Sequence, residues 1–182
     1  MPQWFAIATA IFLCPMFIAS GLAKLRSGDV VDAADAYRVL PYGVVRSIFP
    51  ALPWMEIGAG VLLLGWFAQI GLAIAATLLC VFSLGIAINL VRGRSIECGC
   101  RGSGRRISPA LLVENLLLAT ASLAAITAPT SEPLVATLAS SAPGSNAADS
   151  WAAVIIAASA YFAYRLLIVS RAATRALSKG GF

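Results

Sequence analysis

The chain has 182 residues and a net charge of +5; 60% of its residues are apolar, only 12% are charged, and its mean hydropathy is +0.88. A soluble domain carries about 25% charged residues, so half that share cannot cover a water-facing surface of this size. This composition excludes an ordinary soluble enzyme, a disordered chain and a nucleic-acid-binding domain, and it predicts an all-α integral membrane protein that contacts the lipid bilayer.

Five apolar stretches follow one another along the chain, each about as long as a helix that crosses a bilayer. They cover approximately residues 4–23, 49–67, 68–91, 109–128 and 151–170. The second and third are separated by almost nothing, which predicts a tight antiparallel helix hairpin. No Lys or Arg precedes Lys24, so the first stretch lacks the basic region of a cleavable signal peptide, and we expect it to be retained.

The segments between these stretches give finer detail. Residues 24–48 leave room for a short amphipathic helix around 31–40, and Ser108-Pro109 is typical of a helix start, with Ser as the N-cap. We expect a four-helix membrane domain over residues 1–128. An outer-side loop over 129–150 and a fifth transmembrane helix with a basic tail over 151–182 would follow.

The basic residues outside the five stretches predict an orientation. With five crossings, the first loop, the third loop and the C-terminus share one side of the membrane, and these segments contain every loop Lys and Arg. The positive-inside rule then predicts an N-terminus outside and a C-terminus in the cytoplasm, in a bacterial inner membrane. Trp4, Trp66 and Trp151 fall at the predicted outer ends of their helices, where an aromatic belt is expected.

The sharpest chemical motif is Cys98-Gly99-Cys100 in the third loop. A disulfide between thiols separated by one residue closes a small, strained ring and is easily reduced. Five arginines in the same loop favour the thiolate form, which is the reactive one. Cys98 and Cys100 are therefore candidate catalytic thiols. Two alternatives stay open: incidental cysteines in a Gly- and Arg-rich loop, or a soft metal site completed by a partner, since a closed zinc site takes four ligands and the chain has no His. We expect no metal site.

The other two cysteines, Cys14 and Cys80, fall at similar depth in the first and third stretches, about 15–18 Å from the outer side at a rise of about 1.5 Å per residue. They could form a buried redox relay if those helices are neighbours. The alternative is that both simply fill apolar space, because Cys behaves as a small apolar residue in packed helices.

Several polar residues fall within or beside the apolar stretches, where ionisable groups are expensive and often functional. Glu56 is a candidate proton donor, ligand-pocket carboxylate or ion-pair staple, with Lys24 or an Arg as its partner. Gly58 and Gly60 beside it would permit a close helix approach. Glu114 and Asn115 lie in the first turns of the fourth stretch, where a carboxylate suits the helix dipole. Glu114 could also pair with Arg92 or Arg101.

These residues carry a resemblance to a known family. The chain resembles the methylamine-utilisation MauE proteins, within the broader group of MauE/DoxX-like redox-associated membrane proteins. The matching pieces are Ser20-Gly21-Leu22-Ala23-Lys24-Leu25, Leu40-Pro41, Glu56 with Gly60, Ala87-Ile88-Asn89-Leu90 through Cys98-Gly99-Cys100, Ile107-Ser108 and Asn115. The resemblance implies a DoxX-like four-helix transmembrane bundle, here with a fifth helix. Arg101 stands where the family usually has Phe, and Glu114 where Arg is common.

The resemblance also implies work with a thioredoxin-like partner, in processing or disulfide formation of the methylamine dehydrogenase small subunit or in a related pathway. The leading hypothesis is therefore a thiol–disulfide oxidoreductase. The alternative is a non-catalytic assembly factor or small-solute carrier that uses Glu56. No cofactor is evident, and no motif supports a quinone. Formation of an oligomer through helix contacts stays open. The predicted orientation puts the Cys98 loop inside, whereas an oxidase for exported proteins would present it outside.

Overall fold

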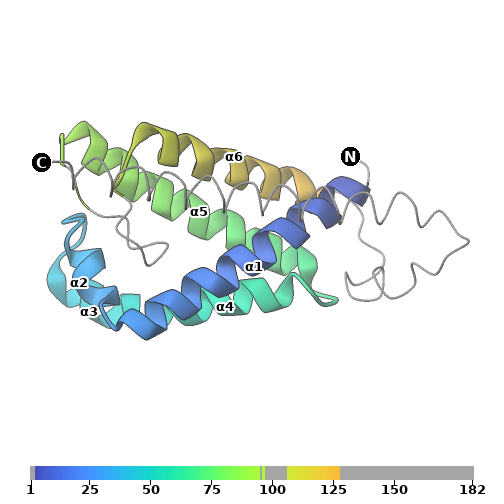
Figure 1. The fold of residues 1–182 in the computed structure, drawn as a ribbon, viewed down its shortest axis with the longest axis horizontal. Coiled ribbons are helices and arrows are strands. Elements are labelled where there is room, and N and C mark those ends of the chain that lie inside the picture. Colours follow the sequence, from blue (N-terminus) through green and yellow to red (C-terminus); the bar gives the residue numbers. More distant parts are fainter. Residues whose placement is uncertain (1–2, 95, 97–105, 128–182) are drawn as a thin grey trace, which may run out of the picture.

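The structure is a computed structural model that describes residues 3–94, 96 and 106–127. Its regular elements in this part of the chain are helical (Figure 1). In chain order they are α1 Gln3–Ser27, α2 Val30–Asp35, α3 Tyr42–Ile48, the 3-10 turn η1 Phe49–Ala51, α4 Leu52–Leu62, α5 Ala68–Val91 and α6 Pro109–Ile126.

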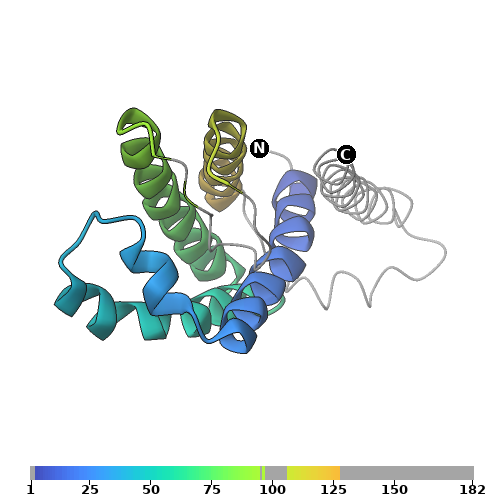
Figure 2. The ribbon, with the colours of Figure 1, turned by 60° about the vertical axis from the view of Figure 1, so that its left-hand side comes forward.

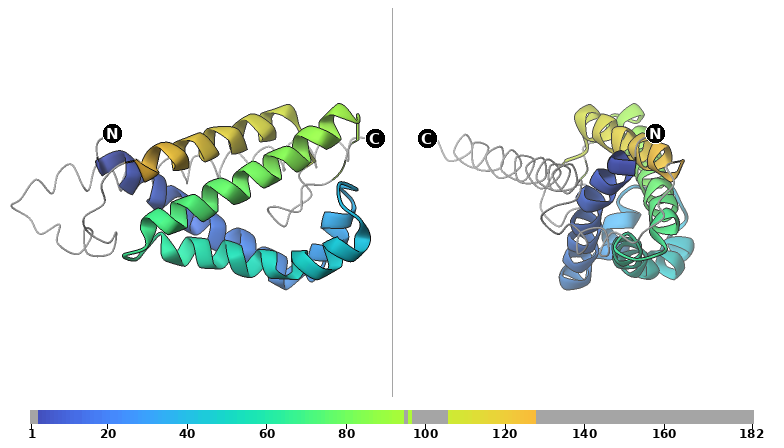
Figure 3. Two further views of the ribbon diagram at one scale, coloured as in Figure 1. Left: turned by 180° about the vertical axis from the view of Figure 1, so that it is seen from behind. Right: turned by 90° about the vertical axis from the view of Figure 1, so that its right-hand side faces the viewer.

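Four of these helices pack side by side with alternating direction. Helix α1 packs mainly on α4, and α5 packs mainly on α6, while contacts between α4 and α5 and between α1 and α6 join the two pairs. Figure 3 shows the bundle that these four helices form, from behind and along its length. The short helices α2 and α3 lie together at one end of it (Figure 2).

Three of the helices are long and apolar enough to cross a membrane: Phe5–Ser27 within α1, Ala68–Val91 and Pro109–Ile126. This confirms an α-helical protein with several candidate membrane helices, and it indicates a membrane protein. The third predicted stretch, 68–91, coincides with α5, and the predicted start of the fourth coincides with that of α6. Ser108 is the N-cap of α6, as predicted, because its Oγ accepts a hydrogen bond from the Leu111 backbone N–H at 3.3 Å.

The second predicted stretch differs from its expected extent. Residues 49–67 were expected to form one span, but α4 covers only 11 residues, about 16 Å of helix against about 30 Å of bilayer core. Prolines explain the early break, because Pro50 and Pro53 lie in the first positions of η1 and α4, where a missing N–H is tolerated. Residues 63–67 then form the predicted tight turn into α5.

Of the other sequence-based expectations, one falls within the described residues and the rest fall outside them. A short helix in the first loop is confirmed, although α2 covers Val30–Asp35 rather than reaching residue 40. The chain leaves helical geometry at Arg38, whose φ is 47°. The loop 129–150, the fifth stretch 151–170 and the Cys98-Gly99-Cys100 motif lie outside the described residues.

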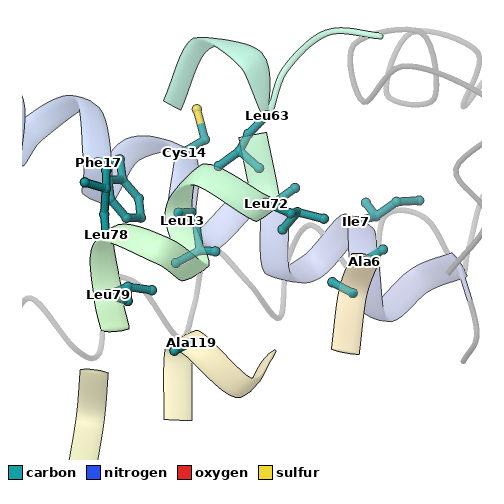
Figure 4. Packing of buried hydrophobic residues seen from close by; sticks show 13 residues of the cluster. Ala6, Ile7, Leu13, Cys14, Phe17, Leu63, Leu72, Leu78, Leu79 and Ala119 are labelled. Carbon is teal, nitrogen blue, oxygen red and sulfur yellow. The ribbon is translucent and has the colours of Figure 1, made fainter. Parts of the chain in front are cut away.

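The centre of the bundle is a single apolar cluster formed by α1, α5 and α6 with the end of α4 (Figure 4). Leu13, Leu63 and Leu72 are almost fully enclosed in it. A smaller apolar cluster of Ile86, Ile107 and Leu111 lies where α5 ends and α6 begins. In a membrane, close packing of such side chains rather than their removal from water holds helices together, so these clusters fix how the helices meet.

Charge is distributed very unevenly along the bundle. Among the described residues, every Lys, Arg, Asp and Glu lies near the end where α1 and α5 finish and α4 and α6 begin, together with α2 and α3 (left in Figure 1). The opposite end, formed by the start of α1, the turn 63–67 and the end of α6, carries none in the part of the chain described. We refer to these as the charged end and the uncharged end.

Candidate functional site

A buried ion pair joins α1 to α4. The ammonium group of Lys24 contacts Oε1 of Glu56, and the two residues are 6% and 1% exposed. Lys24 also donates to the Ser20 hydroxyl at 3.3 Å and lies 4.9 Å from the centre of the Phe82 ring. Burying either charge alone would be expensive, whereas pairing and a cation–π contact offset that penalty. Of the partners that the sequence offered for Glu56, Lys24 or an Arg, the structure places Lys24 beside it.

The pair can form because α1 and α4 approach closely at two glycines. A methyl group placed on Gly21 would lie only 2.7 Å from the carbonyl oxygen of Pro53. One placed on Gly60 would lie 2.6 Å from the side chain of Ile18. Sequence reasoning expected close approach at Gly58 and Gly60. It holds at Gly60, but Gly58 has nothing within 4 Å of such a methyl group, so it faces away from α1.

A small pocket opens beside the ion pair at the centre of the bundle. All four helices contribute to its wall, through Met16, Phe17, Ser20, Glu56, Leu79, Phe82 and Asn115. The volume open to the centre of a water-sized sphere is about 30 Å³. Asn115 is 5% exposed and reaches this pocket from α6, so the structure gathers Asn115, Glu56 and Ser20 around one space. Sequence reasoning missed Phe82, which gave no signal among the apolar residues of its helix.

The segment that carries the cysteine motif is held at both of its roots. The Ile107 backbone N–H donates to the Ile96 carbonyl at 3.0 Å, so the chain leaves and re-enters the bundle at one point of the charged end. Both isoleucines belong to the small apolar cluster around Ile86 and Leu111. Cys98 and Cys100 themselves lie outside the described residues, two and four positions beyond Ile96.

A second set of contacts joins the chain just before the cysteine motif to the first loop. Arg94 donates to the Asn89 side-chain oxygen at 3.3 Å and to the Tyr37 carbonyl at 3.4 Å. Arg92, which sequence reasoning offered as a partner for Glu114, donates to the Arg38 carbonyl at 3.0 Å. Both arginines therefore contact the first loop. The fully buried Asn89 was part of the matching motif, but its bond to Arg94 depends on geometry that the sequence does not show.

The remaining candidates are Cys14, Cys80 and Glu114. Cys14 is buried in the apolar core of the bundle, whereas Cys80 is exposed on the outside of α5, and both are free thiols. The structure therefore does not bring them together as a relay. Glu114 is half-buried in the second turn of α6, beside Asn115 in sequence.

Comparison with known protein families covers the part of the chain that holds the described helices. The family model described as "Methylamine utilisation protein MauE" matches residues 2–128, well over half of the chain. The chain belongs to the MauE family. The matched region ends just after α6, so every described helix, the Lys24–Glu56 pair and the pocket fall inside it.

Three relatives, each called "Methylamine utilization protein MauE", show how far the likeness to individual members of the MauE family extends. The protein of Paracoccus denitrificans is 37% identical over 125 residues, which cover 66% of this chain and 67% of the relative. The protein of Methylophilus methylotrophus is 35% identical over 98 residues, 52% of each chain. That of Methylorubrum extorquens is 33% identical over 115 residues, 60% of this chain and 62% of the relative. The matches thus span about half to two thirds of the relatives' length. No solved structure matches the chain.

Proposed function

We propose that this chain is a membrane thiol–disulfide redox protein that supports maturation of a partner protein through Cys98 and Cys100. The observation that carries the proposal is the hydrogen bond from Ile107 to Ile96, which closes the base of the segment containing both thiols. Because Cys98 follows Ile96 by only two residues, the dithiol is tethered close to a fixed point at the charged end. The arginines of the same segment favour thiolate there.

The proposed reaction is reversible exchange with a thioredoxin-like protein. A thiolate of the reduced protein attacks one sulfur of the other protein's disulfide, which forms a mixed disulfide and releases a thiolate. The second thiol of the attacking protein then resolves the mixed disulfide. Two electrons and two protons pass from the dithiol to the disulfide, and no further oxidant is required. The relatives' names point to methylamine utilisation. We therefore propose that the protein finally matured is the methylamine dehydrogenase small subunit or a protein of a related pathway.

The same proposal includes a fold and an orientation. We propose a DoxX-like four-helix domain over residues 1–128, a loop over 129–150 on the outer side, and a fifth membrane helix with a basic tail over 151–182. The separation of charged and uncharged ends supports an orientation with the charged end in the cytoplasm of a bacterial cell and the N-terminus outside. Thiol exchange would then take place on the cytoplasmic face of the inner membrane.

Trapping of the mixed disulfide tests the proposed function. In the full chain, either Cys98→Ser or Cys100→Ser leaves one thiol that can attack but not resolve, so a disulfide-linked adduct with a thioredoxin-like protein should accumulate. Cys14→Ser and Cys80→Ser are the matched controls, and neither should yield the adduct. If neither loop variant forms an adduct and a variant lacking both loop thiols keeps full maturation activity, the redox function is wrong.

The buried Lys24–Glu56 pair favours a second candidate, a non-catalytic assembly factor or small-solute carrier in which the helices do the work. This candidate is separated from the first by comparing Glu56→Gln with a variant that lacks all four cysteines. Loss of maturation only in Glu56→Gln supports the second candidate. Loss in the cysteine-free variant supports the redox protein.

A further inference from the structure

The side chain of Asn115 is a buried amide at the wall of the central pocket. Among the described residues no hydrogen bond is found for its amide, although the residue is 95% buried and lines the central pocket. The buried Asn89 shows the usual situation, because its NH₂ donates to the Gly85 carbonyl at 3.0 Å and its oxygen accepts from Arg94. Buried amides nearly always have a protein or water partner, so the pocket next to Asn115 is expected to supply one.

The size of the pocket decides what can bind there. Its volume of about 30 Å³ is measured for the centre of a water-sized sphere. One bound water needs about 10–15 Å³ on this measure, so there is room for roughly two. The fit is therefore to a molecule of one or two heavy atoms.

The charges around the pocket decide what kind of small molecule fits. The negative charge of the Glu56 carboxylate is already compensated by the ammonium group of Lys24 beside it. A further cation or anion would leave an uncompensated charge in the bundle, whereas a neutral molecule would not. Ser20, Glu56 and Asn115 offer a hydroxyl, carboxylate oxygens and an amide, and a buried water typically makes about three hydrogen bonds to such groups.

We propose that one or two water molecules bind in this pocket and bridge Asn115 of α6 to the Ser20 and Glu56 side chains of α1 and α4. The bridge gives α6 a polar connection to the ion pair. Asn115 is then a water-binding residue at the centre of the bundle. This inference does not depend on the cysteines or on the proposed redox function.

Selective labelling makes the site observable in the full chain. The sequence contains only three asparagines, Asn89, Asn115 and Asn146, so ¹⁵N-asparagine gives three side-chain NH₂ signals. In lipid nanodiscs, the NH₂ protons of Asn115 should show cross-relaxation at the water frequency, even though the residue lies within a membrane bundle. Asn89 is the matched control, since its buried NH₂ donates to protein and should show no such peak.

Two variants assign the signal and complete the test. Asn115→Gln removes the labelled signal while retaining an amide, and Asn115→Leu removes the amide in a side chain of similar size. If Asn115→Leu does not fold, the wild-type and Asn115→Gln spectra still decide the question. A water cross-peak at Asn115 but not at Asn89 supports the site. Cross-peaks from Asn115 to lipid acyl chains instead, or no water cross-peak, would overturn it.

Discussion

At the scale of single residues, the ion pair between Lys24 and Glu56 is the most demanding feature of the molecule. Both groups lie out of reach of bulk water, and each compensates the other's charge. The desolvation penalty of such a pair is comparable to its attraction, so the pair as a whole adds little stability. Removing only one partner destabilises the protein, because the remaining buried charge keeps its desolvation penalty and loses the attraction of the opposite charge.

This reasoning predicts a non-additive mutant cycle. Glu56→Gln and Lys24→Met should each lower the free energy of unfolding in detergent by about 3–5 kcal/mol, whereas the double variant should lose much less than the sum. Arg26→Gln, at an exposed position two residues from Lys24 in the same helix, is the control and should change stability by about 0.5 kcal/mol or less. Losses in the double variant equal to the sum of the two singles would show that the groups do not interact.

At the scale of elements, the close contact between α1 and α4 depends on two glycines, which have no side chain to keep the helices apart. Gly21 and Gly60 let the two helix backbones approach, and that approach brings Lys24 within reach of Glu56. The contact also explains how a helix as short as α4 keeps a fixed place in the bundle. Its position depends on α1 and α5 rather than on its own length.

Alanine substitutions test this contact. At Gly21 the added methyl group meets the Pro53 carbonyl, which is backbone and cannot rotate away, so Gly21→Ala should destabilise the protein by about 1–3 kcal/mol in thermal unfolding. Gly58→Ala is the matched control on α4: the space there is open, and the better helix propensity of Ala should leave stability unchanged or raise it by up to about 1 kcal/mol. Equal effects at both glycines would contradict a close α1–α4 contact at Gly21.

At the scale of the whole molecule, the separation of charge between the two ends governs how the bundle sits in a membrane. The charged end contains one terminus of each of α1, α4, α5 and α6 together with α2 and α3, and the uncharged end presents the exposed aromatic residues Trp66 and Phe67. Charged residues cannot be carried through the bilayer core cheaply, so the two ends are not interchangeable.

Single cysteines placed at the two ends report the orientation. In a variant without the four native cysteines, Gln69→Cys at the uncharged end should react with a membrane-impermeant thiol reagent in intact cells. Asp32→Cys on α2 should react only after the cells are opened. Both positions are exposed in the structure, so burial does not account for a difference. Labelling of Asp32→Cys in intact cells would reverse the proposed orientation.

The elements show where sequence reasoning succeeds. The extent of α5 and the start of α6 with its Ser108 cap follow from the pattern of apolar residues and from local capping chemistry, and both are confirmed. The extent of α4 was overestimated because apolar residues continue through the prolines at one end and the turn at the other. Hydropathy measures preference for lipid, and it does not show where a helix breaks.

The sequence by itself determined that this chain is helical and suited to a membrane, and it marked Lys24, Glu56 and Asn115 as polar residues in or beside apolar stretches. Only the tertiary structure decided that Lys24, 32 residues away, is the partner of Glu56 and that Asn115 reaches the same pocket. The physical reason is that composition and period act locally along the chain, whereas the partners of a buried polar group depend on how closely helices approach, which here is set by Gly21 and Gly60.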